Sequence, residues 1–317
     1  MKDLAVIVVS FNVRTLLEEC LASVYASQGT AFDVCVVDNA SSDGSAQMVR
    51  ERYPQARLVE SPYNGGYAYA NNLAIRALRA VPGLDADAAP AGEGYHYVLL
   101  LNPDTRVGPD DFARAVAFFD AHPEVGIVGP KLVRPDGSLD LACRRSFPTP
   151  EVSLYRITGL SKLFPRSRRF ARYNLTYLDP DETAEVDAVV GAFMMVRSEA
   201  IRQAGLLDER FFLYGEDLDW ALRIKVFGWK VVYYPEITVL HHKGESSRRH
   251  RHRATIEFYR SMLLFYRKHY ASSTFFLLDW LIVAAIYLRG ALAYVQAMLM
   301  APIFSLLRPQ RPASPRP

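Results

Sequence analysis

A short apolar run that stops at a proline is the feature that most constrains how this chain can fold. Tyr97–Leu101 is long enough for a buried strand and too short for a helix. Asn102-Pro103 ends the run, because proline cannot carry the hydrogen bonding of a strand onward. Asp104 therefore stands at the C-terminal mouth of a predicted strand, where open α/β sheets bind ligands. A divalent cation could lie between this carboxylate and a diphosphate, although Asn-Pro-Asp alone is equally an ordinary turn.

The segments before this run alternate between strands and helices. Leu4–Ser10, Phe32–Val37 and Ala56–Glu60 have the length of strands, and the first is the continuous apolar run of a central parallel strand. Amphipathic helices are expected after the first strand, with Asn12 as N-cap, and over about residues 68–79. This alternation predicts a doubly wound α/β domain with a mostly parallel central sheet and flanking helices.

The second half of the domain is predicted from shorter patterns. Asp136-Gly137 indicates a hairpin turn. Val186–Val196 is an apolar strand whose Gly191 marks a bulge or a close approach of the backbone. Trp229–Tyr234 and Ile237–Leu240 are predicted as two edge strands that lead into a histidine pair.

Side chains able to bind metal or move a proton gather at the ends of these elements. Three carboxylates within four positions at the start of the helix near residue 216 exceed what helix capping needs. A strand-end carboxylate and a histidine could hold one cation, and a second carboxylate could deprotonate an acceptor hydroxyl. Those roles suit the displacement of a nucleoside diphosphate from a sugar. The residues are Asp38, Asp104, Glu216, Asp217, Asp219, His241 and His242.

Five motifs in a fixed order carry a resemblance to a known family. The chain resembles the family 2 inverting glycosyltransferases, which have the Rossmann-like GT-A fold, and in particular their rhamnosyltransferase-like branch. The similarity covers about residues 3–247. The motifs are Val8-Val9-Ser10-Phe11-Asn12, Val36-Val37-Asp38-Asn39-Ala40-Ser41-Ser42-Asp43-Gly44-Ser45, Asn64-Gly65-Gly66-Tyr67, Leu101-Asn102-Pro103-Asp104 and Gly215-Glu216-Asp217-Leu218-Asp219-Trp220.

The resemblance implies a donor site with a metal ion, Mg²⁺ or Mn²⁺. Asp104 would be the metal-binding aspartate of the family's Asp-X-Asp motif, in which Asn102 here replaces the first aspartate. His241 would be a late metal or diphosphate ligand, with His242 an equal candidate on composition. Asp38 would contact the base or ribose. The full set implied in donor binding is Ser10, Phe11, Asn12, Asp38, Asn39, Asn64, Gly65, Gly66 and Asn102.

The resemblance also assigns catalytic roles and a reaction. Asp217 would be the general base, and Glu216 or Asp219 would orient it or serve the helix. The expected reaction moves rhamnose from dTDP-rhamnose to a polyprenyl-diphosphate-linked glycan in cell-envelope polysaccharide synthesis. A nucleotidyltransferase is the first alternative, but its basic Gly-rich N-terminal loop is missing. A non-catalytic scaffold that binds nucleotide sugars is the second.

Basic residues gather in two segments. Residues 141–185 mix basic and aromatic side chains, as expected of a loop over an anionic substrate or of a solvated surface, and both interpretations remain open. Residues 241–269 hold eight Lys or Arg against two Glu, a net charge of +6. Across the whole chain the formal net charge is +3, which is too small to indicate a nucleic-acid partner.

The C-terminal part predicts a membrane-associated extension. Residues 275–304 are mostly apolar, but a single span would place Arg289 near the membrane centre, at a cost of about 2.5–3.5 kcal/mol. We therefore expect helices that lie in or dip into the cytoplasmic leaflet, with the basic segment on anionic headgroups. A dimerising helix pair, and thus a homo-oligomer, is the alternative.

The expected domains are residues 1–247 for the glycosyltransferase, 248–307 for the helical extension and 308–317 for a disordered tail. Met1-Lys2-Asp3 leads directly into a strand, so no signal peptide is expected. The expected location is the cytoplasmic face of an inner membrane, peripheral or partly embedded.

Overall fold

The computed structural model describes residues 2–84, 94–242 and 251–306. The chain divides into two compact units, Met1–Ser246 and Ser247–Pro317. The predicted disordered tail lies outside the described residues. Most of the predicted loop over 82–94 and part of the basic segment after residue 242 lie outside them as well.

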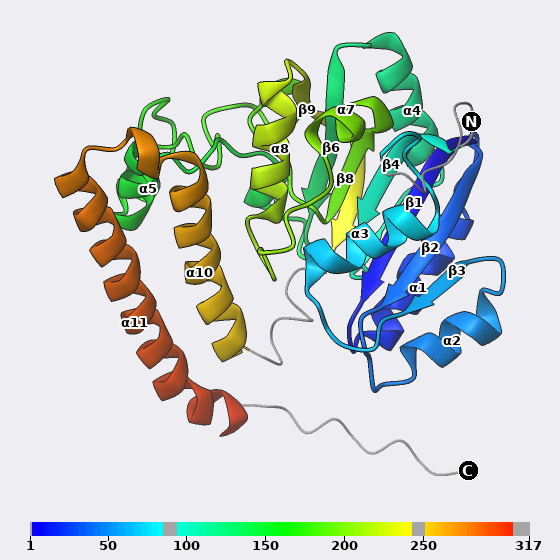
Figure 1. The fold of residues 1–317 in the computed structure, drawn as a ribbon, viewed down its shortest axis with the longest axis horizontal. Helices are drawn as coiled ribbons and strands as arrows, with labels where there is room; N and C mark the ends of the chain where they lie inside the picture. Colours follow the sequence, from blue (N-terminus) through cyan, green and yellow to red (C-terminus); the bar gives the residue numbers. More distant parts are fainter. Residues whose placement is uncertain (1, 85–93, 243–250, 307–317) are drawn as a thin grey trace. The chain divides into compact units, whose positions relative to one another are not determined.

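Unit 1 is built on one mixed sheet of nine strands with helices packed against it (Figure 1). The strand order is β3-β2-β1-β4-β8-β6-β9-β5, and β7 pairs with β9. The strands are β1 (Lys2–Ser10), β2 (Phe32–Asp38), β3 (Arg57–Glu60), β4 (Tyr95–Leu101), β5 (Thr105–Arg106), β6 (Val125–Val133), β7 (Ala184–Val186), β8 (Phe193–Arg197) and β9 (Lys230–His241).

The first half of the sheet is parallel, as predicted. A helix follows each of β1, β2 and β3, and such crossovers make consecutive strands parallel. β1 is buried from Leu4 onward, which explains its continuous apolar sequence. In the β1–β2 register Ser10 lies opposite Asp38, and β4 runs beside β1 on the other side. The C-terminal ends of these strands therefore share one edge of the sheet.

The second half of the sheet is not as predicted. β8 is antiparallel to both β4 and β6, so the whole sheet is mixed rather than mostly parallel. The two predicted edge strands after Trp229 are a single strand, β9, which lies inside the sheet between β6 and β5. β9 runs on through Pro235 because its pairing with β6 shifts register between Pro130 and Lys131. The predicted strand over 186–196 is two short strands, β7 and β8, joined by a loop.

The helices confirm the pattern-based predictions in the first half and at the acidic motif. The turn at Asp136-Gly137 is also confirmed, by a bridge between Val133 and Leu139. The helices of unit 1 are α1 (Arg14–Tyr25), α2 (Ser45–Arg52), α3 (Tyr67–Ala77), α4 (Asp111–Ala121), η1 (Leu141–Cys143), α5 (Pro150–Ile157), α6 (Leu160–Leu163), α7 (Ser198–Ala204) and α8 (Glu216–Val226).

Unit 2 is a pair of helices joined by a short turn (Figure 1). They are α10 (Arg251–His269) and α11 (Phe276–Leu306), with η2 (Ala271–Ser273) between them. Asp279 on α11 accepts from the Tyr266 hydroxyl (2.8 Å) and from the Arg267 guanidinium (2.9 Å) of α10. These bonds fix the turn end of the helix pair.

Candidate active site

Two buried polar side chains lie at the C-terminal ends of β1 and β2. Ser10 and Asp38 are partners in the strand register, and both are buried. Asp38 accepts a hydrogen bond from the Ser41 N–H at Oδ2 (2.9 Å). Asp38 Oδ1 and Ser10 Oγ have no hydrogen-bond partner in the described part of the chain. Because nearly all buried polar atoms in proteins are paired, these two are candidates for contacts with a bound ligand.

Asn39, next to Asp38 at the end of β2, is hydrogen-bonded to the predicted donor-binding segment Asn64-Gly65-Gly66. Its Nδ2 donates to Asn64 Oδ1 (3.0 Å) and to the Gly66 carbonyl (3.2 Å), and its Oδ1 accepts from the Gly65 N–H (3.1 Å). Gly66 has a φ of 91°, and a Cβ there would lie 2.4 Å from the Phe212 carbonyl oxygen. Glycine is therefore required at this close approach, just before α3. The four predicted residues of this group come together in one network.

Asn12 has a different role from the one predicted. It does not cap α1, whose N-cap position is Val13 and has no side-chain cap. Asn12 instead has a φ of 55°, and its Oδ1 accepts from the Ser42 N–H (2.8 Å). A positive φ is tolerated by asparagine better than by most residues. Asn12 thus links the end of β1, next to the half-buried Phe11, to the loop that follows Asp38.

Asp104 and His241 meet because β9 runs antiparallel to β5. Thr105 of β5 pairs with His241 of β9, and the His242 N–H donates to the Asp104 carbonyl (2.8 Å). His241 Nε2 lies 3.4 Å from Asp104 Oδ1, and both side chains are buried. Of the two histidines left open by the sequence, His241 is the one whose side chain reaches Asp104.

This pair fits one side of a divalent-cation site. Within the described ranges, no group of three or more His, Cys, Asp or Glu side chains is placed to hold a metal ion. Cations such as Mg²⁺ commonly take one or two carboxylates from the protein and complete their shell with water and substrate phosphates. Asp104 and His241 would be the protein's ligands in such a site. Asn102 is fixed beside them by its N–H on the Ala192 carbonyl (2.9 Å).

Asp140 holds the other nitrogen of His241. Its side chain is completely buried, and Oδ2 lies 3.1 Å from His241 Nδ1. Its Oδ1 accepts from the Ala142 N–H (3.2 Å) at the start of η1. Burial lowers the pKa of His241, but the hydrogen bonds to Asp104 and Asp140 outweigh it and raise that pKa to about 9. A carboxylate on the far nitrogen of a histidine is the usual support of a metal-binding imidazole.

Asp217 is the second residue of α8 and is bound on both carboxylate oxygens. Oδ2 accepts from the Arg145 guanidinium (2.7 Å) and from the Gly191 N–H (3.2 Å). Oδ1 accepts from the Leu218 N–H (2.7 Å). The predicted close approach at Gly191 is confirmed, because a Cβ there would lie 3.1 Å from the Tyr67 hydroxyl oxygen.

Tyr67 connects the two sides of the site. Its hydroxyl donates to the Gly191 carbonyl (2.7 Å), next to Asp217. Burial, followed by the charges of Glu216 and Asp217 and then of Asp104, raises the pKa of Tyr67 well above its ordinary value. Tyr67 thus lies within electrostatic range of both Asp104 and Asp217.

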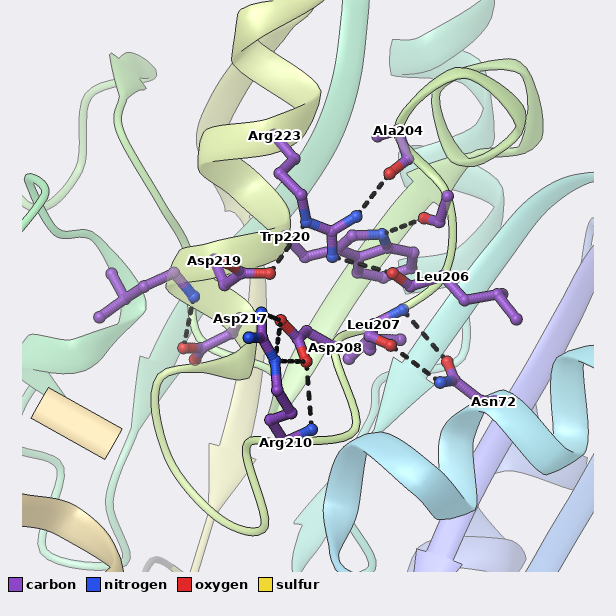
Figure 2. A network of polar contacts seen from close by, with 12 residues as sticks. Asn72, Ala204, Leu206, Leu207, Asp208, Arg210, Asp217, Asp219, Trp220 and Arg223 are labelled. Atoms are coloured by element: carbon purple, nitrogen blue, oxygen red, sulfur yellow. Dashed lines mark hydrogen bonds and ion pairs between the residues drawn. The ribbon is translucent and has the colours of Figure 1, made fainter. Parts of the chain in front are cut away.

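The other two carboxylates of α8 have separate surroundings. Glu216 Oε2 is buried without a partner among the described residues, and burial followed by the charge of Asp217 raises the pKa of Glu216 to about 8. Asp219 Oδ2 accepts from Arg223 Nε (2.9 Å). Figure 2 shows that the Arg223 guanidinium also reaches the carbonyls of Ala204 and Leu206. Asp219 therefore anchors the α7–α8 loop through Arg223.

The sequence interpretation missed Asp140 and Arg145. Asp140 lies just before the region 141–185, and Arg145 lies near its start. For that region the sequence pattern is compatible with either a loop over the substrate or a solvated surface. Arg144-Arg145 stands between Cys143 and Ser146-Phe147, and both arginines are buried. Their placement beside a buried thiol was the one signal in the sequence that these charges do not belong to a solvated surface.

The most informative relative is an N-acetylglucosaminyl-diphospho-decaprenol L-rhamnosyltransferase of Mycobacterium tuberculosis. It is 33% identical over 248 residues, which cover 78% of this chain and 78% of the relative. The low-salt glycan biosynthesis hexosyltransferase Agl10 of Haloferax volcanii is 27% identical, over 70% of this chain and 62% of that protein.

The fold is shared with solved glycosyltransferase structures. A mannosyltransferase from Pyrobaculum calidifontis, solved in complex with GDP-Man and Mn²⁺, matches with a TM-score of 0.55 at 19% identity, over 98% of this chain and 78% of that one. This likeness confirms the predicted GT-A fold.

A family model described as glycosyl transferase family 2 matches residues 5–204, which include Ser10, Asp38, Asp104 and Asp140. The match ends before α8 and β9, so the assignments of Asp217 and His241 depend on the geometry described above. The length of this match and the mycobacterial relative establish that the chain belongs to the family 2 glycosyltransferases.

Proposed function

We propose that this chain is an inverting glycosyltransferase that moves rhamnose from a nucleoside diphosphate donor to a hydroxyl of a lipid-linked glycan in cell-envelope polysaccharide synthesis. The donor sugar and the lipid-diphosphate acceptor are taken from the name of the mycobacterial relative. The observation that carries the mechanism is that two buried pairs line the site: Asp104 with His241, a candidate cation site, and Asp217, a candidate base, with Arg145.

The donor would bind at the shared edge of β1, β2 and β4. Asp38 Oδ1 and Ser10 Oγ would pair with the ribose or the base, because both are buried without partners among the described residues. The Asn39–Gly66 network would shape the neighbouring backbone. Asp104 and His241 would hold the cation, and the imidazole nitrogen favours Mn²⁺ over Mg²⁺, which prefers oxygen ligands.

The reaction needs one base and a stabilised leaving group. The acceptor hydroxyl oxygen bonds to the anomeric carbon of the donor while the bond from that carbon to the diphosphate breaks, and the diphosphate leaves with the electron pair. Asp217 takes the hydroxyl proton. When bound, the cation would supply positive charge beside the leaving diphosphate. A single displacement of this kind inverts the anomeric configuration.

The test is a transfer assay on the full chain. A short polyprenyl-diphosphate N-acetylglucosamine acceptor is incubated with dTDP-rhamnose, UDP-N-acetylglucosamine or GDP-mannose, each with Mn²⁺, with Mg²⁺ or with EDTA. We expect rhamnosylated acceptor that depends on the metal. In a second arm with a nucleoside triphosphate and a sugar 1-phosphate, release of inorganic diphosphate would instead show a nucleotidyltransferase. Donor binding without turnover under every condition would show a scaffold.

We also propose that unit 2 binds an anionic membrane on the cytoplasmic face. Among the described residues one helix is long and apolar enough to cross a membrane: α11 over Phe276–Met298, which is mostly exposed. Arg253 and Arg260 are exposed and lie seven residues apart on α10. Residues seven apart lie on the same side of a helix, so these arginines form a basic stripe suited to lipid phosphates.

Vesicle sedimentation tests this placement. The full chain should bind phosphatidylglycerol vesicles more strongly than phosphatidylcholine vesicles, and salt should weaken binding by screening. Replacing Arg253 and Arg260 by glutamine should cost about 1 kcal/mol of binding per arginine. The matched control replaces two exposed arginines of α2, Arg50 and Arg52, and should bind as the parent does. Unchanged binding both in the double variant and in a chain cut after Tyr270 would contradict the proposal, and a dimer lost on that cut would favour a dimerising helix pair.

A further inference from the structure

Arg145 is a buried arginine whose position is fixed by its own backbone. Its N–H donates to the Ala188 carbonyl (2.9 Å), and its carbonyl accepts from the Ala188 N–H (3.0 Å). This bridge joins the segment after η1 to the loop between β7 and β8. The guanidinium enters the site from a different part of the chain than α8, which carries Asp217.

The guanidinium makes a close ion pair with Asp217. Arg145 Nη2 lies 2.7 Å from Asp217 Oδ2 and 2.8 Å from the Val189 carbonyl oxygen, and the two charged side chains are 8% and 7% exposed. Burial opposes the charge on Arg145, but Asp217 outweighs it and raises the pKa of the guanidinium above its ordinary value. Arg145 therefore stays positive at every pH at which the protein is folded.

The hydrogen bonds to Asp217 distinguish its two oxygens. Oδ2 accepts two bonds, from Arg145 and from the Gly191 N–H, whereas Oδ1 accepts one described bond, from the Leu218 N–H. A carboxylate oxygen accepts about two hydrogen bonds. Oδ2 is thus fully used, and Oδ1 keeps a lone pair for a proton.

We propose that Arg145 is a positioning residue: it keeps a positive charge beside Oδ2 of Asp217, directs Oδ1 toward the acceptor hydroxyl and thereby sets the lower pH limit of transfer. This inference rests on the proposed role of Asp217 as the base.

The other groups around Asp217 do not replace Arg145. Glu216 and Asp219 on α8 are acids, and Tyr67 on α3 is a neutral phenol whose hydroxyl binds Gly191. Asp104, whose charge also acts on Tyr67, is another acid. The positive charge at hydrogen-bond distance from Asp217 therefore comes from Arg145.

Arg144 offers a matched control. It is the adjacent residue, it is also buried, and its guanidinium binds the Leu178 and Asp179 carbonyls and lies 5.1 Å from the Tyr233 ring centre. These partners are neutral. A substitution at Arg144 therefore removes a buried arginine from the same segment without changing the charge that faces Asp217.

The experiment measures kcat against pH for the full chain at saturating donor and acceptor. Removal of an arginine beside an aspartate raises the pKa of the acid by about 1–3 units. We expect Arg145→Gln to raise the midpoint of the acid limb by that amount, while donor Kd stays the same. Arg145→Lys keeps the charge, so its midpoint should stay near the parent's. Arg144→Gln should leave the midpoint unmoved.

Two results would overturn the inference. One is a lower kcat in Arg145→Gln with an unmoved midpoint, and the other is an equal shift in Arg144→Gln. If Arg145→Gln does not fold, a shifted midpoint in Arg145→Lys contradicts the charge-based role and an unshifted one supports it. Asp217→Asn distinguishes a failure of the proposed base, Asp217, from a failure of the proposed role of Arg145. Parent-like activity in that variant refutes the base itself, whereas inactivity combined with an unmoved limb in Arg145→Gln refutes only the role of Arg145.

Discussion

Replacing Asp140 with asparagine tests the metal side of the site without removing a ligand. Asp140 uses one oxygen for the Ala142 N–H (3.2 Å) and the other for His241 Nδ1 (3.1 Å). Asparagine has a single oxygen, so when that oxygen stays on Ala142 its NH₂ group faces Nδ1. His241 must then carry its proton on Nε2, the nitrogen that faces Asp104 and would bind the cation. We therefore expect a loss of metal affinity.

The size of this loss is estimated from the effect of mutating residues that hydrogen-bond to a metal ligand. Such changes lower metal affinity by about 10- to 100-fold, which corresponds to about 1.4–2.7 kcal/mol. Asparagine has nearly the volume of aspartate, so the substitution opens no cavity at this completely buried position. The reversed amide would preserve the His241 contact but leave the Ala142 N–H unpaired, at a cost of about 1–3 kcal/mol in the free energy of unfolding.

The assay is a Mn²⁺ titration followed by electron paramagnetic resonance of the free ion, with nucleoside diphosphate present. Urea denaturation of the same samples measures the free energy of unfolding. The matched control is Asp136→Asn on the same hairpin, because Asp136 is exposed and its carboxylate binds the N–H and hydroxyl of Ser138. The control should keep the parent's Mn²⁺ affinity. Parent-like affinity together with parent-like stability in Asp140→Asn would refute the reasoning.

Three further predictions concern stability and donor binding. Burial raises the pKa of Glu216 to about 8 from 4.5, so its carboxyl destabilises the folded chain progressively as pH rises through this range. Glu216→Gln should therefore gain stability relative to the parent from about pH 5 to pH 8 in urea denaturation, and a pH-independent difference would contradict this linkage. Gly66→Ala should destabilise the fold by more than the roughly 1 kcal/mol expected for Gly137→Ala, because both have positive φ but a Cβ is blocked at Gly66 and meets nothing within 4 Å at Gly137. Asp104→Ala should abolish the Mn²⁺ dependence of donor binding in calorimetry, and an unchanged dependence would exclude Asp104 as a ligand.

The sequence predicted the first half of the fold well because that half repeats a simple unit. β1, β2 and β4 are buried on both faces, so their residues form continuous apolar runs that end where the ligand site begins. β9 could not be predicted in the same way. Its pattern is interrupted at Pro235 and Glu236, and its place inside the sheet depends on pairing with three other strands.

The candidate site also has a part that the sequence predicts and a part that it does not. Asp38, Asp104 and Asp217 stand at ends of elements, where a local pattern marks them. The partners of the site are set by the tertiary fold. His241 is 101 residues from Asp140, and Asp217 is 72 residues from Arg145. Contacts over such distances leave no periodic signal, so the roles of Asp140 and Arg145 become visible only in the structure.

Steady-state transfer by Asp217→Asn is the most direct test of the account. Asparagine keeps the size of the side chain and removes its basicity, and loss of a general base lowers kcat by about 10²- to 10⁴-fold. Donor Kd should stay at the parent's value, since deprotonation belongs to the transition state. Asp219→Asn should act mainly on stability through Arg223, to which Asp219 is bound. A kcat close to the parent's in Asp217→Asn, beside a large loss in Asp219→Asn, would contradict the account and place the base at Asp219.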